Sequence, residues 1–413
     1  MEKIYVVGVG MTNMGKMAEC SVKSLTNEAV TEALSDAGVL QEDIQSAFFS
    51  NATQGHMEGQ NMIPGEIALR DMGFERIPMM NVENACASGS SAFNLATQFL
   101  RAEEGDLALA VGAEKMFSAD RERMFSVFDG AWDVSKAEAS KENLVRMGEG
   151  VEVPEGTTSN KPYSLFMDIY TFLARLHMDH FGTTQEQLAM VAAKNHDHSV
   201  NNPLAQYRQP MTVAEVLAAK PISWPLTLPM CAPISDGGAA VIACHADALT
   251  AEQKSRAIPV LACEIGIGSD RRADQFDQHL CRLIAQRAYN QAGIGPEDIS
   301  VAEVHDATAF AELQQTENLG FCELGKGGEL VASGATRLGG RIPVNPSGGL
   351  QSKGHPIGAT GLAQIIELVA QLRGEAGKRQ VEAPRFAIAE NGGGFHGYEE
   401  AVATITILGG PQT

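Results

Sequence analysis

Cys86 is the thiol best placed for nucleophilic chemistry. It lies in NVENACASGSSAF, where small residues surround it and a helical pattern follows directly. Backbone N–H groups and the positive end of the dipole at a helix N-terminus stabilise a thiolate and can hold a developing oxyanion. The sequence therefore offers Cys86 as a nucleophile, although its position alone fits a buried structural cysteine equally well.

His355 is a candidate for the base that activates this thiol. It lies in NPSGGLQSKGHPIGATG, between Gly354 and Pro356, and a helical pattern begins a few residues later. A cysteine and a histidine are the minimum for an activated thiol nucleophile. Because a glycine-rich loop ending in His-Pro is unusual for a plain surface loop, we favour a catalytic role over an exposed loop histidine.

His305 and Asp306 follow an apolar segment in VAEVHDATAFAEL. Open α/β sheets place their sites beyond the carboxyl ends of their strands, so His305 could donate a hydrogen bond to a thioester oxygen while Asp306 holds the loop. The pair could equally cap the helix that follows. Asn391, Gly392 and Gly393 begin a glycine run in ENGGGFHGY, whose N–H groups could turn toward a bound oxygen or simply form a turn between strands.

The common cofactor motifs are absent from the sequence. Gly8 and Gly10 begin a dinucleotide-like loop, but Asn13 stands where the third glycine of GxGxxG would fall. There is no complete P-loop, no GxSxG elbow and no HExxH pair. We therefore expect neither a bound nicotinamide nor a metal.

Elements that could position these residues follow from the apolar pattern. Apolar runs predict strands, and the segments between them carry helical periodicity. Buried strands that alternate with helices indicate an α/β protein in which helices cover a mostly parallel sheet. The predicted strands cover 4–10, 46–50, 107–113, 239–244, 259–268 and 386–390, and the predicted helices include 22–37, 88–101, 278–292 and 361–373.

An internal repeat orders these elements. Residues 32–53 align without gaps with 287–308, nine of the 22 positions are identical, and each copy is a helix, a turn and a strand. The likeness continues through the loops of Cys86 and His355 and into the next strands. We therefore predict two like halves related by a pseudo-twofold axis, with Cys86 and His355 facing each other across it.

A long insertion interrupts the first half. The predicted N-terminal half covers 1–115 and 235–258, the inserted loop domain covers 116–234, and the C-terminal half covers 259–413. The insertion holds both tryptophans and a helical stretch from about 164 to 201. It is expected to form a cap over the two halves.

Charge and cysteine content exclude several classes of partner. The chain has 31 basic and 51 acidic residues, a net charge of −20, which argues against nucleic acid and against an anionic membrane surface. No apolar run approaches the roughly 18 residues of a spanning helix. Seven cysteines without a CxxC pair do not indicate a disulfide framework, and they fit a reducing, cytoplasmic location.

Taken together, the loops of Cys86, His305 and His355 and the 391–394 glycines resemble those of a thiolase. The likeness is strongest to the sterol-carrier-protein-type thiolases and related bacterial and archaeal acetyl-CoA acetyltransferases, whose SKGHPxGATG motif matches Ser352–Gly361. The resemblance covers the whole chain. It implies the thiolase fold, in which two βαβαβ-type halves form a five-layered αβαβα core.

The resemblance also implies roles for the site residues. Cys86 would accept the acyl group, His355 would be its base, and His305 would help to polarise the thioester carbonyl. The Cys86 N–H and the glycine amides of 392–394 would form a second oxyanion site.

One departure from the family pattern concerns the second catalytic cysteine. Thiolases use it as acid and base, and it comes from a Cys-x-Gly loop or from a His-Asp-Cys motif. Here Ala307 fills one place, and Glu390-Asn391-Gly392 fills the other. Glu390 could act as a base, whereas Asn391 could not. The remaining Cys-His-His set is similar to that of ketoacyl synthases, whose two histidines support condensation without a second thiol.

The expected function is that of an acyl-CoA acyltransferase of lipid metabolism. It would form an acyl-enzyme on Cys86 and make or cleave a C–C bond of a 3-ketoacyl-CoA, with CoA as substrate and no permanently bound cofactor. Two alternatives stay open: a C–C lyase of the same fold that performs a retro-aldol reaction on a CoA ester, and a non-catalytic acyl-CoA-binding or scaffold subunit. The family implies a homodimer or a dimer of dimers, and in some members a small OB-fold partner protein.

Overall fold

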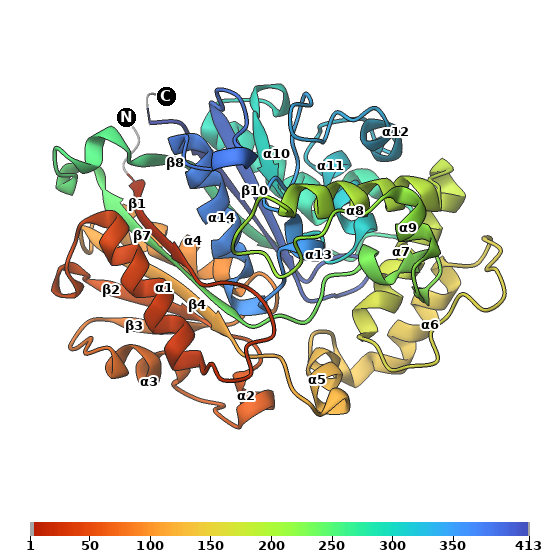
Figure 1. The fold of residues 1–413 in the computed structure, drawn as a ribbon, viewed down its shortest axis with the longest axis horizontal. Helices are drawn as coiled ribbons and strands as arrows, with labels where there is room; N and C mark the ends of the chain where they lie inside the picture. Colours follow the sequence, from red (N-terminus) through yellow and green to blue (C-terminus); the bar gives the residue numbers. More distant parts are fainter. Residues whose placement is uncertain (1–3, 412–413) are drawn as a thin grey trace.

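A single nine-stranded sheet runs through the computed structural model, which describes residues 4–411 (Figure 1). Its strand order is β3-β2-β4-β7-β1-β8-β11-β10-β9, and β5 and β6 form a separate small ribbon. The strands are β1 (Ile4–Met11), β2 (Ser46–Ser50), β3 (Met79–Val82), β4 (Leu107–Glu114), β5 (Pro221–Ser223), β6 (Leu226–Thr227), β7 (Gly237–His245), β8 (Ile258–Ile267), β9 (Val301–Glu303), β10 (Phe386–Gly393) and β11 (Val402–Gly409).

The sheet is mixed, so the expectation of a mostly parallel sheet is wrong. Strand β2 pairs in parallel with β3 and β4, and β9 pairs in parallel with β10, whereas β7 and β11 run antiparallel to both of their neighbours. Continuous apolar runs show that a strand is covered on both faces, which is typical of parallel sheets. Here helices also cover the antiparallel strands, so the apolar pattern does not report strand direction.

The two halves repeat each other strand by strand, as the internal repeat predicts. Outward from the β1–β8 junction, the first half continues through β7, β4 and β2, and the second through β11, β10 and β9. The repeated turns match in detail. Gly38 and Gly293 end their helices at φ 66° and φ 70°, and the side chains of Asp43 and Asp298 accept the backbone N–H three residues earlier at 2.8 Å. Two like halves are therefore confirmed.

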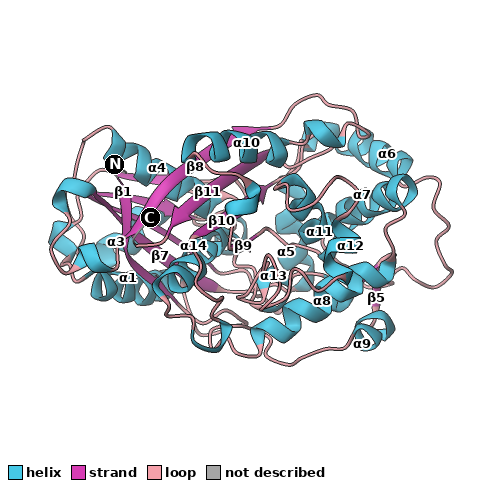
Figure 2. Ribbon diagram, turned by 90° about the horizontal axis from the view of Figure 1, so that it is seen from above, coloured by secondary structure: helices cyan, strands magenta, loops and turns pink. Residues whose placement is uncertain are grey.

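Five layers of helix and sheet result. Helices α1 (Val22–Ala37) and α3 (Pro64–Asp71) cover the outer face of the first half-sheet, and α10 (Leu280–Ala292) covers that of the second (Figure 2). Between the half-sheets lie α4 (Ser88–Arg101) and α14 (Ile357–Arg373), which pack against each other. The predicted αβαβα core is confirmed.

The two central helices approach each other almost backbone to backbone. A methyl group at Gly89 would lie 2.9 Å from the carbonyl oxygen of Gly358, and one at Gly361 would lie 2.5 Å from the Ser90 nitrogen. Only glycine leaves room for this approach. The contact joins the N-terminal ends of α4 and α14, the two places that the loops of Cys86 and His355 enter.

Residues 116–234 contribute helices that gather with α11 at the end of the molecule remote from the termini (Figure 2). The domain boundaries named above stay predictions. The helices of this segment are α5 (Arg121–Ser126), α6 (Ala137–Met147), α7 (Leu165–Phe181), α8 (Gln185–Ser199) and α9 (Val213–Ala218), and the remaining helices of the described chain are α2 (Gln54–Glu58), α11 (Ala309–Asn318), α12 (Gly327–Ala332) and α13 (Gly349–Ser352).

None of the helices within residues 4–411 combines the length and the apolar character that crossing a lipid bilayer requires.

Candidate active site

Cys86, His305 and His355 meet in one buried cluster. The Cys86 sulfur and one nitrogen from each imidazole all lie within 4.8 Å of one another. The two rings pack edge to face, with centroids 5.3 Å apart. The loops that correspond in the two halves therefore bring a thiol and an imidazole together, and the strand-end loop of His305 adds a second imidazole.

The loop between β3 and α4 holds Cys86 in place. Ala85 adopts φ 48°, and the Ser88 hydroxyl donates to the Ala85 carbonyl at 2.6 Å while accepting the Asn84 N–H at 2.8 Å. The backbone N–H groups of Cys86 and Gly394 lower the pKa of the thiol. Among the 392–394 glycines, Gly394 is thus the one whose amide reaches Cys86.

The surroundings of Cys86 favour its neutral thiol form. Burial, assisted by the carboxyl of Glu114, raises its pKa to about 12, and the N–H groups of Cys86 and Gly394 oppose this rise only in part. The expectation that a helix N-terminus would leave this sulfur ionised is therefore wrong. The side chain is only 8 % exposed, and desolvation of a thiolate outweighs two amide dipoles.

Contacts to both the backbone and the imidazole ring hold His355 in place. Its backbone N–H donates to the Ser235 hydroxyl at 2.9 Å, and its Nδ1 lies 2.7 Å from the Thr360 hydroxyl oxygen. Burial lowers the pKa of the imidazole well below its usual value, and the neighbouring His305 and Lys353 lower it further. The ring is therefore neutral at physiological pH and able to accept a proton.

His305 is held by its backbone and leaves its ring free. Its N–H donates to the Glu390 carboxyl at 2.9 Å, while neither ring nitrogen has a hydrogen-bond partner in the described chain. Burial lowers the pKa of this imidazole to about 4. Its neighbour Asp306 accepts the Leu350 N–H at 2.7 Å and the Gln351 side-chain amide at 2.9 Å. Asp306 thus holds the loop that leads to His355.

Glu390 and Asn391 point to opposite sides of β10. The Glu390 carboxyl contacts the His305 N–H and, at 3.4 Å, the Cys281 thiol, and burial together with Glu400 raises its pKa to about 8. Glu390 does not line the cavity described below. Asn391 accepts a hydrogen bond from the Ser90 hydroxyl of α4 at 2.8 Å.

Gly392 and Gly393 lie within β10 and pair with β11. Gly393 also passes close to the nucleophile loop, because a methyl group there would lie 2.2 Å from the Asn84 carbonyl oxygen. The glycine run therefore serves two purposes in this structure: it lets β10 approach the Cys86 loop, and it delivers the Gly394 amide to the sulfur.

Glu114 is a site residue that sequence reasoning missed. It ends β4, is fully buried, and accepts the backbone N–H groups of Ala52 and Thr53 and, at 2.9 Å, that of Gly358. It thereby ties the first turn of α14 to the N-terminal half, next to Cys86. The only signal in the sequence is an acidic residue at the end of a strongly apolar strand, LALAVGAE.

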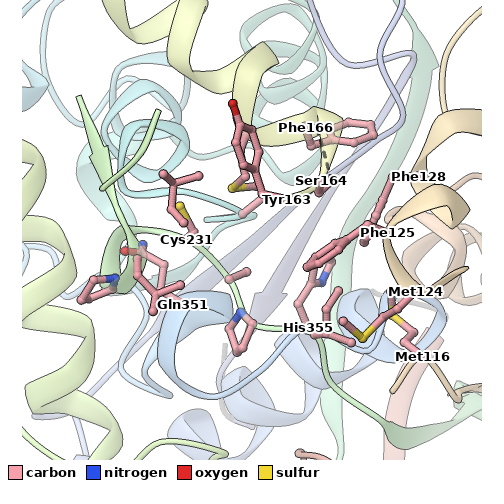
Figure 3. A pocket seen from close by; sticks show the side chains of 18 of the residues that line it. Met116, Met124, Phe125, Phe128, Tyr163, Ser164, Phe166, Cys231, Gln351 and His355 are labelled. Carbon is pink, nitrogen blue, oxygen red and sulfur yellow. Dashed lines mark hydrogen bonds between the residues drawn. The ribbon is translucent and has the colours of Figure 1, made fainter. Parts of the chain in front are cut away.

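A cavity of about 800 Å³ opens over the cluster. Cys86, His305, His355 and Ala307 all line it, so a methyl group stands where the His-Asp-Cys motif would place a second thiol. Figure 3 shows an apolar group on one side of His355, with Gln351 and Cys231 on the other. That apolar group consists of Met116, Met124, Phe125 and Phe128.

The charged residues of this cavity are all basic. Lys16, Arg121, Lys161 and Lys220 line it, and no aspartate or glutamate does. None of these four side chains forms an ion pair with a carboxylate in residues 4–411. In a chain of net charge −20, this cavity lining favours an anionic ligand.

Within residues 4–411, two groups of side chains have the donor types of a metal site. One is the Cys86 cluster itself, and the other is His279, Cys281 and Glu400, buried behind β10. In the second group, His279 pairs with Glu400 at 3.4 Å, and the Cys281 thiol bonds to Glu390. These donors are therefore already paired within the protein.

Comparisons with known proteins agree with this geometry. The family model "Thiolase, N-terminal domain" matches residues 4–219, and "Thiolase C-terminal domain-like" matches residues 269–408. An acetyl-CoA acetyltransferase of Methanothermobacter thermautotrophicus is 37 % identical over 96 % of this chain and 98 % of its own length. Sterol carrier protein 2 of Bos taurus is 34 % identical over 100 % of this chain and 75 % of its own.

Two further relatives differ in what their names describe. A benzoylsuccinyl-CoA thiolase subunit, BbsB, of Thauera aromatica is 32 % identical over 95 % of both chains. A solved structure, the "Ltp2-ChsH2(DUF35) aldolase", superposes with a TM-score of 0.77 over 100 % of this chain and 98 % of that one, at 22 % identity, which shows the shared fold. On the two family models and these relatives, the chain belongs to the thiolase family, and the expectation of a thiolase-like acyltransferase is confirmed at the level of the family.

Proposed function

We propose that the protein is an acyl-CoA acyltransferase that forms an acyl-enzyme on Cys86 and makes or cleaves a C–C bond of a 3-ketoacyl-CoA. The observation that carries the proposal is the Cys86, His305 and His355 cluster, which lines a cavity whose charged residues are all basic. A thiol beside a neutral imidazole can attack a thioester, and basic side chains favour the phosphates of CoA.

Acylation follows from the neutral state of the pair. As the Cys86 sulfur attacks the thioester carbon, its proton passes to the imidazole of His355 and the carbonyl electrons move onto oxygen. We assign the stabilisation of the developing oxyanion to the N–H groups of Cys86 and Gly394, the two backbone groups that lower the pKa of the thiol. Collapse of this intermediate breaks the bond to the CoA sulfur, which takes the proton from His355.

The second half-reaction needs an acid and a base for a proton on the carbon next to the thioester. The family's second thiol is replaced by Ala307, and the Glu390 carboxyl lies behind His305 rather than in the cavity. We assign this proton transfer to the imidazoles of His305 and His355, which lie beside Cys86 and carry no charge at neutral pH. His305 is suited to it because neither of its ring nitrogens has a hydrogen-bond partner among the described residues.

The CoA moiety is assigned to the basic residues that line the cavity. Lys16, Arg121, Lys161 and Lys220 are exposed and would hold its phosphates, with CoA as substrate rather than permanently bound cofactor. The names of the relatives from Methanothermobacter thermautotrophicus and Thauera aromatica both include a CoA ester. The apolar group around Phe125 and Phe128 would receive the acyl chain.

A homodimer and a small partner protein are part of the proposal. Strand β3 is one edge of the sheet, and Met80 on it is 54 % exposed, beside a segment with two further exposed apolar side chains, Met62 and Ile63. Pairing of two such edges would cover them. The solved structure of similar fold is named as a complex with a DUF35 protein, which motivates a search for such a partner of this chain. We also propose a cytoplasmic location for the protein.

Acyl-enzyme formation tests the proposal. The protein, its Cys86→Ala variant and its Cys231→Ala variant would each be incubated with acetyl-CoA and with longer 3-ketoacyl-CoAs, with and without free CoA, and intact mass and products would be followed. Cys231 is a matched control, because it is a second buried thiol that lines the same cavity. We expect one added acyl group in the wild type and Cys231→Ala but none in Cys86→Ala.

The same experiment separates the alternatives. Saturable binding of the CoA ester with no adduct and no product would support a scaffold subunit. Cleavage of a 3-hydroxyacyl-CoA by both the wild type and Cys86→Ala would support a lyase. An acyl adduct that persists in Cys86→Ala would remove Cys86 from the proposed role.

A further inference from the structure

Thr360 lies in the first turn of α14 and contacts the imidazole of His355. Its hydroxyl oxygen lies 2.7 Å from His355 Nδ1 and donates to the carbonyl oxygen of Pro356, four residues back, at 3.0 Å. Both Thr360 and His355 are buried. A hydroxyl has one proton to donate, and helical threonines commonly give it to the carbonyl four residues back. The Thr360 oxygen then remains as an acceptor for an Nδ1–H group.

We propose that Thr360 is a positioning residue that holds His355 in its Nδ1–H tautomer. In this tautomer the lone pair of the ring lies on Nε2, for which the described chain offers no hydrogen-bond partner. One nitrogen of this ring lies within 4.8 Å of the Cys86 sulfur, and we assign that contact to Nε2 because Thr360 occupies Nδ1. The inference rests on the proposed function, because it concerns the base that receives the Cys86 proton.

The proton balance of acylation follows from this arrangement. The S–H proton moves to Nε2 while sulfur bonds to the thioester carbon, and the imidazolium keeps its Nδ1–H bond to Thr360. The proton on Nε2 then leaves with the CoA sulfur. In the opposite tautomer, Nε2–H would face the S–H group as a second donor, and no base would be available.

The contact also distinguishes the two histidines. Neither ring nitrogen of His305 has a hydrogen-bond partner within residues 4–411, so nothing there selects its tautomer. His355 has a fixed orientation and a fixed partner at Nδ1. The structure therefore assigns the base for acylation to His355 and leaves His305 able to use either nitrogen.

Two variants of Thr360 and one control test this role. Thr360→Val keeps the shape and removes the acceptor, and Thr360→Ser keeps the hydroxyl. Thr26 in α1 is a matched control, because it is buried and its hydroxyl donates to the carbonyl four residues back, at 2.8 Å, far from the cavity. Thr26→Val therefore reports the cost of losing such a bond alone.

The first readout is the rate constant for acylation of Cys86 by acetyl-CoA, followed by intact mass. We expect it to fall about ten- to hundredfold in Thr360→Val, since an unpaired buried Nδ1–H favours the other tautomer. The rate constant of Thr360→Ser should stay within about threefold of the wild-type value, and that of Thr26→Val should equal the wild-type value. The dissociation constant for CoA should be the same in all four proteins, because only a general loss of structure would change it.

The second readout is the ¹⁵N spectrum of the wild type labelled at histidine, with His355→Gln used to assign its signals. It reports the tautomer even if no acyl-enzyme forms, so failure of the proposed function and failure of this inference are distinguishable. We expect a protonated Nδ1 and an unprotonated Nε2 on His355. The reverse assignment, a wild-type acylation rate in Thr360→Val, or an equal loss in Thr360→Ser would overturn the inference.

Discussion

The rate of Cys86 acylation should hardly change between about pH 6 and pH 9. The pKa of the buried Cys86 thiol is raised to about 12 and that of His305 is lowered to about 4, with that of His355 also well below its usual value. A thiol with such a pKa is ionised to roughly one part in a thousand at pH 9, and an imidazole with such a pKa is protonated to roughly one part in a hundred at pH 6. The neutral reacting forms therefore keep constant populations across this range.

Single-turnover acylation measures this directly. The protein would be mixed with saturating acetyl-CoA at each pH, quenched in acid and analysed by intact mass. We expect the rate constant to vary by less than about twofold within the range and to fall below it, because proton binding by the lowered-pKa imidazoles removes the base at low pH.

A thiolate mechanism would give a different profile. A rate that rises about tenfold per pH unit between pH 6 and pH 8 would show that a small thiolate population reacts, and a fall above pH 7 would show that an imidazolium is required. Either profile would refute the neutral-pair mechanism. Glu390, with its pKa raised to about 8, titrates inside the range and serves as a control. Glu390→Gln should remove any small step near pH 8 and leave the flat profile.

Three further predictions concern stability and binding. Because the folded protein raises the pKa of Glu390 from 4.5 to about 8, the stabilisation from its protonated carboxyl is full below pH 4.5 and is lost as the pH rises toward 8. In urea unfolding, the free energy of unfolding of Glu390→Gln should therefore change less with pH than that of the wild type, by as much as about 5 kcal/mol over this range. An unchanged pH dependence would contradict this. Gly89→Ala places a methyl group 2.9 Å from the Gly358 carbonyl oxygen. It should lower the free energy of unfolding by about 1–3 kcal/mol and slow the acylation of Cys86. A variant as stable as the wild type would show that α4 and α14 can separate freely. Lys161→Ala and Lys220→Ala should each weaken CoA binding, measured by calorimetry, about two- to fivefold at low salt and by less at high salt. If both variants bind CoA as tightly as the wild type at low salt, the phosphates bind elsewhere.

Local signals in the sequence specify much of the framework. Helix α1 spans the predicted 22–37 because Ser21 caps its first turn and Gly38 ends it in the left-handed conformation. Helix α4 likewise spans the predicted 88–101. Helix α14 begins at Ile357 instead of the predicted 361, since Pro356 is its N-cap and Ile357, Gly358 and Ala359 already form its first turn. The repeat, visible in 32–53 and 287–308, then fixes how these elements are arranged.

The features that the sequence did not reveal arise from residues far apart in the chain. The charge state of Cys86 depends on how deeply the fold buries it and on Glu114, and neither is encoded in the surrounding loop. The basic lining of the cavity comes from positions 16, 121, 161 and 220, which show no common pattern along the chain. Strand direction was also missed, because antiparallel strands covered on both faces have the same apolar composition as parallel ones.

The two halves differ at the positions where the second half carries the catalytic loop of His305. In the alignment of the two halves, Ser50 and Asn51 occupy the positions of His305 and Asp306. The Ser50 hydroxyl donates to the Gly358 carbonyl of the opposite lobe at 2.7 Å. The Asn51 amide donates at 2.8 Å to Glu114 of its own lobe, which in turn accepts the Gly358 N–H, so this pair joins the lobes instead of handling protons. One lobe supplies the sulfur and the other supplies both imidazoles. Each polypeptide consequently contains one reaction centre rather than two, and neither lobe expressed alone would contain a complete one.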